Sequence, residues 1–413
     1  MKQSTRRLSR DDLLAEDVRH VSAGPRSALV WALACVVLAF SWQALKVESE
    51  FRGNWTGLFD TGRDFPPPPE LSFEHIETVS DTSGYDGQFY HYVAHDPFFQ
   101  HSLARYIDNP RLRYGRILVP FCAYALAAGN PYWIDLSYRF TVLAFVFLGA
   151  YWFARQMLGK GHRADSALLF LLMPATILSI EVLAVDVALM ALCAAFFLMQ
   201  DEPPWKLLPV LALAPLVRET GLLLPAAAIL AAALGKQWRH AALFTATITP
   251  WLAWTWFVAL HTQSQPYPIT LIPLWETLKA LVHVHNASAG VFGWVLSVVD
   301  RLTIVGSIVA IGLGLGQVRR AGAVSLACIG FALVGTALQR GDVWENYHAH
   351  TRLLSPLYMW LAMGATERSF RVGFLPLYLV LPRFLLQLLS QIPVFFQWCA
   401  GLVRHYLPLQ RVP

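Results

Sequence analysis

Charged residues are scarce in this sequence. They make up 14% of its 413 residues, whereas soluble domains carry about 25%. Hydrophobic residues make up 56%, and the mean hydropathy is +0.45. A chain this poor in charge does not present a water-soluble surface, so the composition excludes an ordinary soluble domain. We expect an all-α polytopic membrane protein, because helices satisfy their own backbone hydrogen bonds within lipid.

Cysteine is also sparse, and no two cysteines form a C-x-x-C pair. All five lie in apolar stretches: Cys35, Cys122, Cys193, Cys328 and Cys399. This pattern excludes a disulfide framework and a cysteine metal site, and it predicts small hydrophobic side chains within the membrane. We also expect no cleavable signal peptide. The polar stretch before the first apolar run is long, and no small-x-small site follows that run.

Acidic residues are outnumbered, and the net charge is +5. In a membrane protein this favours basic loops beside anionic headgroups. We therefore expect contacts with membrane lipids and no nucleic-acid partner. The 15 Trp and 14 Tyr are typical of aromatic belts at the two membrane interfaces.

The order of polar and apolar stretches predicts the topology. A tail (1–26) precedes a first transmembrane helix (27–45), a long external loop (46–114), a multi-span domain (115–400) and a C-terminal tail (401–413). The first apolar run is long enough to cross a hydrocarbon core of about 30 Å. A loop as long as the one that follows it is usually functional. We expect short interfacial helices within it, one of them near Phe98–Ile107.

Charge places the tail and the loop on opposite sides. The tail is basic, with Lys2 and several arginines, whereas the loop between Val47 and Ala104 has only two basic residues. Its ten acidic residues are Glu48, Glu50, Asp60, Asp64, Glu70, Glu74, Glu77, Asp81, Asp86 and Asp96. The positive-inside rule then puts the N-terminus in the cytoplasm and the loop outside. We expect a plasma membrane with this loop facing the exterior.

Further apolar stretches predict a bundle of about 10–13 transmembrane helices. They lie near 117–129, 137–154, 165–180, 182–199, 206–217, 221–235, 241–260, 291–314, 321–338, 351–365 and 373–396. Several are too short to cross a membrane unaided, and prolines interrupt them, which is tolerated only against protein or a water-filled cavity. A second polar loop, His261–Ala289, is expected on the outer side.

One loop conflicts with simple alternation of spans. The segment Arg155–Arg163 is strongly basic, yet counting every span places it outside. Two explanations remain open. Either one short span is re-entrant, or this loop binds a lipid phosphate.

The stretch Ser83–His91 holds the first candidate site. Gly84 and Gly87 allow a tight turn around Asp86. Four rings surround this carboxylate in the sequence: Tyr85, Phe89, Tyr90 and Tyr92. Such rings stack on sugar faces or pack at the membrane surface, and an acid among them is expected to have a raised pKa, as a general base needs. His91 is the alternative base. A turn-forming role for Asp86 stays open.

Ionisable groups within the apolar stretches are further candidates. Glu181 and Asp186 lie five residues apart, so they need not share a helix face. Arg218 and Glu219 form a local pair between Pro215 and Gly221. Arg218 is either half of a structural ion pair or a phosphate ligand.

Two basic clusters also fit an anionic ligand. His348, His350 and Arg352 open an apolar stretch, where Arg and His suit phosphate capture. The H-x-H pair also permits a metal, although no third ligand lies nearby in the sequence. Arg113 and Arg116 follow the first loop directly and either grip a lipid-linked phosphate or contact headgroups. An Arg352 that only snorkels to the interface is the remaining alternative.

The layout resembles the GT-C class of polytopic membrane glycosyltransferases. The string from Tyr85 to Tyr90, with Arg113-Tyr114-Gly115-Arg116-Ile117-Leu118, looks like a bacterial group tied to cell-surface glycopolymers. Met173–Thr176 and His350–Pro356 are similar to weaker motifs of PIG-V-type mannosyltransferases.

This resemblance implies a GT-C-like bundle and an inverting sugar transfer. The donor would be a polyprenyl-phosphate-linked sugar, and the acceptor a glycan, lipid or protein. By carry-over, Asp86 would be the base and Arg352, with His350, would bind the donor phosphate. From their own positions in the sequence, Arg113, Arg116 and Arg218 are further candidates for binding this phosphate. Sugar or acceptor contacts are assigned to Tyr85, Gln88, Tyr90, Glu181, Asp186 and Glu219. Asp86 lacks an acidic neighbour, so we expect no cofactor and favour a reaction without a metal.

Two other functions remain open. A transporter or flippase of lipid-linked sugars would also need buried arginines and carboxylates, although it would more often show internal repeats. A non-catalytic subunit of a polysaccharide assembly complex is the third reading.

Overall fold

The computed structural model describes residues 10–79, 83–263, 272–283, 290–319, 322–364 and 370–406. Parts of three predicted segments lie outside these ranges: the start of the N-terminal tail, the end of the C-terminal tail, and much of the polar loop His261–Ala289. The side chain of Cys399 also lies outside the description. Cys35, Cys193 and Cys328 are buried free thiols, as predicted.

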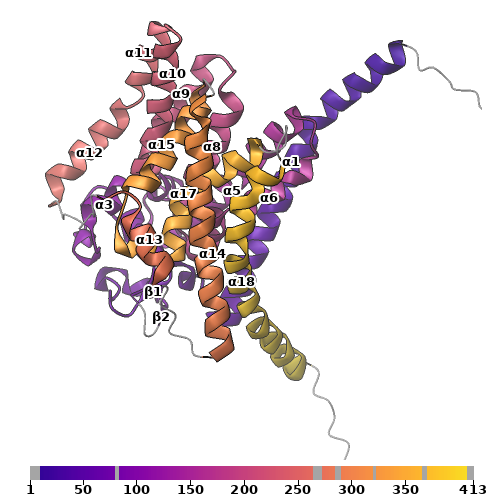
Figure 1. Cartoon of the computed structure of the whole chain (residues 1–413). Coiled ribbons are helices and arrows are strands. Elements are labelled where there is room, and N and C mark those ends of the chain that lie inside the picture. The colour runs from indigo at the N-terminus through magenta and orange to yellow at the C-terminus, as the bar shows by residue number, and fades with distance from the viewer. Residues whose placement is uncertain are drawn as a thin grey trace, which may run out of the picture.

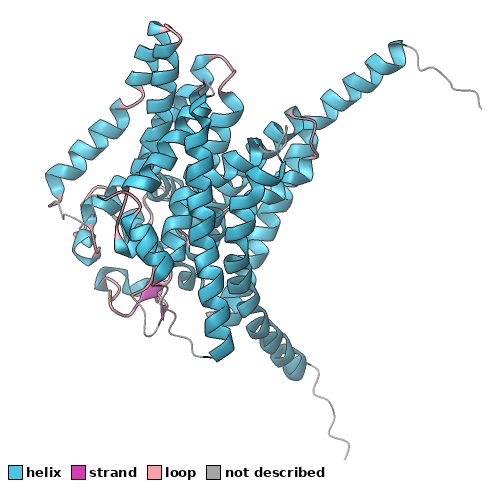
Figure 2. Ribbon diagram, viewed as in Figure 1, coloured by secondary structure: helices cyan, strands magenta, loops and turns pink. Residues whose placement is uncertain are grey.

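Helices make up most of the described chain (Figure 2). The α-helices are α1 (Arg10–Glu50), α2 (Asp86–His95), α3 (Pro110–Gly115), α4 (Leu118–Leu126), α5 (Ile134–Gly159), α6 (Leu168–Leu171), α7 (Pro174–Val182), α8 (Asp186–Met199), α9 (Pro204–Val217), α10 (Leu223–Leu234), α11 (Trp238–Ala246), α12 (Thr249–His261), α13 (Trp275–Val282), α14 (Gly290–Leu315), α15 (Ala323–Ala337), α16 (Gly341–Trp344), α17 (Tyr347–Gly364) and α18 (Phe370–Tyr406). Short 3-10 helices are η1 (Trp55–Phe59), η2 (Pro69–Glu74), η3 (Leu103–Tyr106), η4 (Pro131–Trp133), η5 (Ala164–Ala167), η6 (Glu219–Leu222) and η7 (Gly316–Arg319).

Five of the described helical stretches are long and apolar enough to cross a membrane. They are Gly24–Glu50, Pro131–Gly159, Trp238–His261, Gly290–Val318 and Val372–Trp398. A sixth is counted if Ala164–Leu171 and Pro174–Val182, which meet at 65°, form one broken span. The chain is therefore an all-α polytopic membrane protein. The described residues hold fewer long apolar helices than the 10–13 transmembrane helices predicted, because several of the predicted stretches form apolar helices of only 10–17 residues.

The first loop folds into short elements at one end of the bundle (Figure 1). Strands β1 (Thr61–Gly62) and β2 (Thr78–Val79) pair in parallel, and α2, η3 and α3 follow. The expected interfacial helix near Phe98–Ile107 is the short helix η3. These elements cover that end of the membrane helices.

The length of helix α4 bears on the position of the basic segment Arg155–Arg163. With nine residues it is about 14 Å long and cannot cross a bilayer. Helix α5 starts beside the first loop, since Asp135 lies 2.7 Å from His91. Its 26 residues span about 39 Å. The segment Arg155–Arg163 therefore lies at the far end of the bundle from the loop, which favours the re-entrant explanation.

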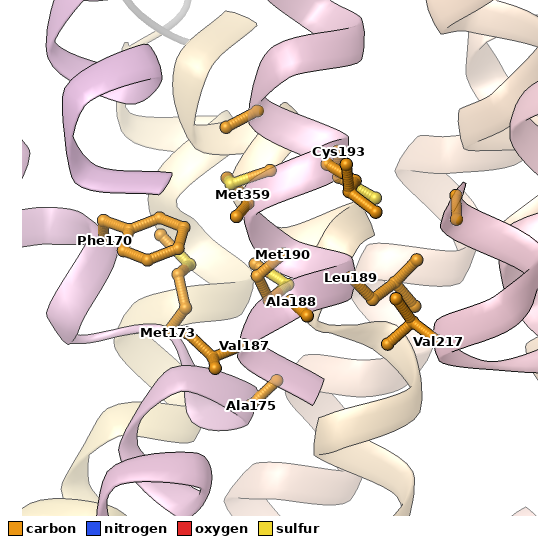
Figure 3. Packing of buried hydrophobic residues seen from close by; sticks show 14 of the residues in the cluster. Phe170, Met173, Ala175, Val187, Ala188, Leu189, Met190, Cys193, Val217 and Met359 are labelled. Atoms are coloured by element: carbon orange, nitrogen blue, oxygen red, sulfur yellow. The ribbon is translucent and has the colours of Figure 1, made fainter. Parts of the chain in front are cut away.

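Helix α8 forms the centre of the packed core. Every residue from Asp186 to Phe197 is buried, as expected of a helix that is apolar all round. Figure 3 shows Val187 and Met190 of this helix in the buried cluster that includes Phe170 and Met173. Pro174 begins α7 after the bend, because proline suits the first helical position. The core thus fixes the position of the first turn of α8, which carries the buried carboxylate of Asp186.

Candidate functional site

Asp86 lies between two arginines from distant parts of the chain. It opens α2, and its Oδ1 is 2.7 Å from Nη1 of Arg113 on α3. Its Oδ2 accepts a hydrogen bond from Nη1 of Arg352 on α17, also at 2.7 Å. The Asp86 side chain is 16% exposed, and both arginine side chains are below 10%. The carboxylate therefore joins the first loop to the membrane helices.

A second carboxylate extends this contact into the core. Asp186, at the start of α8, lies 3.5 Å from Arg352 and forms a short ion pair with Arg218. Arg218 follows the end of α9 in an extended conformation, which turns its side chain away from the helix. Arg352 is thus shared between Asp86 and Asp186.

The third part of the site is Glu219 with Arg116. The Arg116 guanidinium donates to the Glu219 carboxylate at 3.0 Å and to the Tyr90 hydroxyl at 3.0 Å. Arg113 also makes a two-point contact with Asp108, at 2.7 and 2.8 Å. We call this set the arginine cluster: Arg113, Arg116, Arg218 and Arg352 with Asp86, Asp108, Asp186 and Glu219.

The charges of the arginine cluster balance, with four guanidinium groups against four carboxylates. Buried pairs are stable only when each charge keeps a partner. Any anionic ligand would therefore have to take guanidinium contacts from a carboxylate. Asp86 is a suitable group to give them up, because it is the partly exposed carboxylate of the cluster that contacts two arginines, Arg113 and Arg352.

The prediction of a raised Asp86 pKa was wrong. Burial raises the pKa of this carboxyl, but Arg113 and Arg352 outweigh burial and hold it well below its usual range. The predicted sugar platform also fails for three rings, since Phe89, Tyr90 and Tyr92 are buried in the protein. Tyr85 stays partly exposed, with the Arg352 guanidinium 5.5 Å from its ring centre.

The two glycines serve different purposes. Gly84 has a positive φ of 71°, which confirms the expected turn. Gly87 lies inside α2 and permits a close approach, because a Cβ there would meet the Val182 carbonyl oxygen at 2.2 Å. This contact holds the first turn of α2 against the end of α7.

We expect Gly87→Ala to lower the free energy of unfolding by about 1–3 kcal/mol or more, because overpacking usually costs this much. It should also displace Asp86. The control is Gly312→Ala in α14, where a Cβ meets nothing within 4 Å. That change should leave stability equal or slightly higher, since alanine favours helix. Unfolding in detergent measures both, and equal stability of the two variants would contradict the close approach.

Besides Tyr85 and Tyr90, four predicted residues lie outside the arginine cluster: Gln88, Glu181, His350 and His91. Gln88 donates to the Ser83 carbonyl and accepts from the Gly62 amide, so its buried amide shapes the loop rather than binding a sugar. Glu181 is buried and accepts from Trp42, Lys46 and Gln391, which ties α7 to α1 and α18. These contacts occupy both carboxylate oxygens.

His350 and His91 complete that group. His350 contacts Ser307 at 3.0 Å, stacks on Trp344 and lines a cavity of about 340 Å³, so it does not join Arg352 at a phosphate site. This arrangement arises because the two residues point to different sides of α17. His91 is buried between Glu74 and Asp135. Burial lowers its pKa, but these carboxylates raise it to about 10, so at neutral pH it is a poor base.

Several functional candidates were missed in the sequence. Asp108 was not singled out, although it precedes the Arg113 helix and holds that arginine in place. Glu74, His95 and Asp135 surround His91. The spacing of His91 and His95, one helical turn apart, was the available signal, since it puts both on one helix face.

The fold and this site define an α-helical polytopic membrane protein with a buried arginine–carboxylate cluster beneath its first loop. No protein-family model, curated protein or solved structure matches the chain. The resemblance to GT-C glycosyltransferases therefore stays a prediction.

Proposed function

We propose that the protein is a membrane glycosyltransferase that moves a sugar from a polyprenyl-phosphate-linked donor to an acceptor hydroxyl. The observation that carries the proposal is the position of Asp86 between Arg113 and Arg352. It combines one carboxylate that can accept a proton with two guanidinium groups that can bind a phosphate. The acceptor is a cell-envelope glycan, lipid or protein, and the site faces the exterior of a bacterial inner membrane.

The proposed reaction is a single displacement. The acceptor oxygen forms a bond to the anomeric carbon and gives its proton to Asp86. The bond from that carbon to the phosphate oxygen breaks, and its electron pair leaves with the lipid phosphate. Arg113 and Arg352 stabilise the phosphate charge, and the anomeric centre inverts.

Donor binding should change the basicity of Asp86. When the phosphate takes contacts from Arg113 and Arg352, Asp86 loses the partners that hold its pKa low. When rates are plotted against pH, the acid limb of the kcat/KM profile reports a pKa of the free enzyme. The acid limb of the kcat profile reports the corresponding pKa of the bound complex. We therefore expect the acid limb of the kcat profile to lie at a higher pH than the acid limb of the kcat/KM profile. Rates measured between pH 4 and about 8 would show this, and coincident limbs would contradict the exchange of partners.

The direct test uses the purified protein in nanodiscs with a panel of polyprenyl-phosphate-linked sugars and a panel of envelope glycans and lipids as acceptors. We expect release of free polyprenyl phosphate with at least one sugar. A matched liposome assay follows the same donors across the bilayer. Donor that crosses intact, with no release of polyprenyl phosphate, would favour the flippase over the transferase.

A further inference from the structure

A second buried cluster lies at the other end of α2. It consists of Glu74 at the end of η2, His91 and His95 on α2, and Asp135 in the first turn of α5. His91 and His95 are four residues apart, so both imidazoles project from one face of the helix. Three separate segments of the chain thus bring two imidazoles and two carboxylates to one point.

The donor atoms are close enough to share one ion. One atom from each of the four residues lies within 4.8 Å of all the others. Nε2 of His91 is 2.7 Å from Asp135 Oδ1 and 3.1 Å from Glu74 Oε2. Nε2 of His95 is 2.9 Å from Glu74 Oε1 and 4.0 Å from Asp135 Oδ1. Ligands about 2.1 Å from a tetrahedral ion lie about 3.4 Å apart, which falls within this spread.

These atoms face one another at ion-pair distance but without good hydrogen-bond geometry. Nε2 of both histidines, Oε2 of Glu74 and Oδ1 of Asp135 are buried and lack a hydrogen bond of good geometry among the described residues. The histidine side chains are 0% and 3% exposed. Buried polar atoms are normally satisfied, so several convergent exceptions need an explanation. A shared ion would satisfy all four.

The ring of His91 is held in a fixed orientation. It stacks on Phe59 with centroids 3.9 Å apart and planes 6° apart. Such packing aims Nε2 at the two carboxylates. Fixed ligand orientation is what a metal site requires of its surroundings.

We propose that Glu74, His91, His95 and Asp135 bind one divalent transition-metal ion. Two imidazoles with two carboxylates suit Zn²⁺ or Mn²⁺ better than the all-oxygen sites of Ca²⁺ and Mg²⁺. The two negative charges of Glu74 and Asp135 balance the ion. For Zn²⁺, the four protein donors complete a tetrahedral shell, so the site is then structural in type.

The ion would hold the part of the first loop that carries Asp86 against the start of the membrane helix α5. It links η2 and α2 of the first loop to the start of α5, and α2 carries Asp86 at its first position. A cavity of about 310 Å³ reaches His95 and gives the ion a route in. The inference does not depend on sugar transfer, because metal binding is measured without any substrate.

The first experiment uses the full-length protein in detergent. We expect about one Zn²⁺ or Mn²⁺ per chain by elemental mass spectrometry after dialysis without chelator. Chelation with EDTA should lower the melting temperature, and adding back the metal should restore it. Co²⁺ added to the chelated protein should give the visible absorption of a tetrahedral complex.

The variants are His95→Gln and Asp135→Asn, with His101→Gln as the control on the same loop. His101 is exposed and outside the cluster. Loss of one ligand should weaken Zn²⁺ affinity by at least about 100-fold, since even indirect changes cost 10–100-fold. His101→Gln should bind as the wild type does.

Two results would overturn the proposal. In the first, the wild-type protein contains no stoichiometric metal, and its melting temperature does not change with EDTA, Zn²⁺ or Mn²⁺. The cluster would then be a histidine–carboxylate ion-pair network. The other is an equal loss of binding in all three variants, which would mean nonspecific surface binding. The wild-type titration does not require any variant to fold.

Discussion

Asp86→Asn should lower sugar transfer by at least about 100-fold, because a positioned general base contributes about 10²–10⁴. Asparagine keeps the size of the side chain and one carbonyl oxygen for Arg113 or Arg352. It cannot accept the proton of an acceptor hydroxyl. The measurement is release of polyprenyl phosphate per mole of folded protein, together with the envelope glycan made in cells that lack the native gene.

This variant also disturbs the arginine cluster, so stability has to be measured beside activity. Removing one partner of a buried ion pair costs about 3–5 kcal/mol. The matched control is Asp64→Asn, an exposed carboxylate in the same loop, which should change neither quantity. Asp86→Glu keeps the charge and is expected to restore stability more than activity. Wild-type glycan levels in Asp86→Asn cells would contradict the catalytic role.

Much of the helical layout was predictable from apolar runs. Stretches such as 137–154 and 291–314 fall inside α5 and α14, because a bilayer demands long uncharged segments. The number of crossings was not predictable in the same way. Residues 117–129 look like a span, yet only nine residues of them form α4, and Asp135 returns the chain to the first loop. Hydropathy reports apolar character but not which end of the bundle a short helix occupies.

Some of the residues in the candidate site could be predicted from the sequence. A charge within an apolar stretch must find a partner, and that argument selected Asp186, Arg218 and Arg352, which the fold brings together. The same argument also selected Glu181, whose partners Lys46 and Gln391 lie on other helices. Burial cost predicts that a partner exists, but only the three-dimensional packing decides which one.

The pKa of Asp86 shows the limit of local reasoning. The neighbouring rings in the sequence favoured a raised pKa. The decisive neighbours are instead Arg113, 27 residues on, and Arg352, 266 residues on. A charge at contact distance outweighs the apolar surroundings that the sequence makes visible.

The double variant Asp86→Asn with Arg352→Gln should be more stable than its single variants predict. Each single change leaves an unbalanced buried charge and should cost about 3–5 kcal/mol. The double change removes one charge of each sign. Arg113 then keeps Asp108, and Asp186 keeps Arg218. We expect the double variant to cost less than the sum of the singles by about 1–3 kcal/mol.

Activity should not follow stability in this cycle, because the double variant lacks both the base and a phosphate ligand. Denaturant unfolding in detergent gives the coupling energy, and polyprenyl phosphate release gives activity. The exposed pair Arg63→Gln and Asp64→Asn in the same loop is the control cycle, where additive effects are expected. Additive costs at Asp86 and Arg352 would show that the two do not share a buried ion pair. Activity restored in the double variant would show that Asp86 serves only to neutralise Arg352, and the transfer mechanism would need another base.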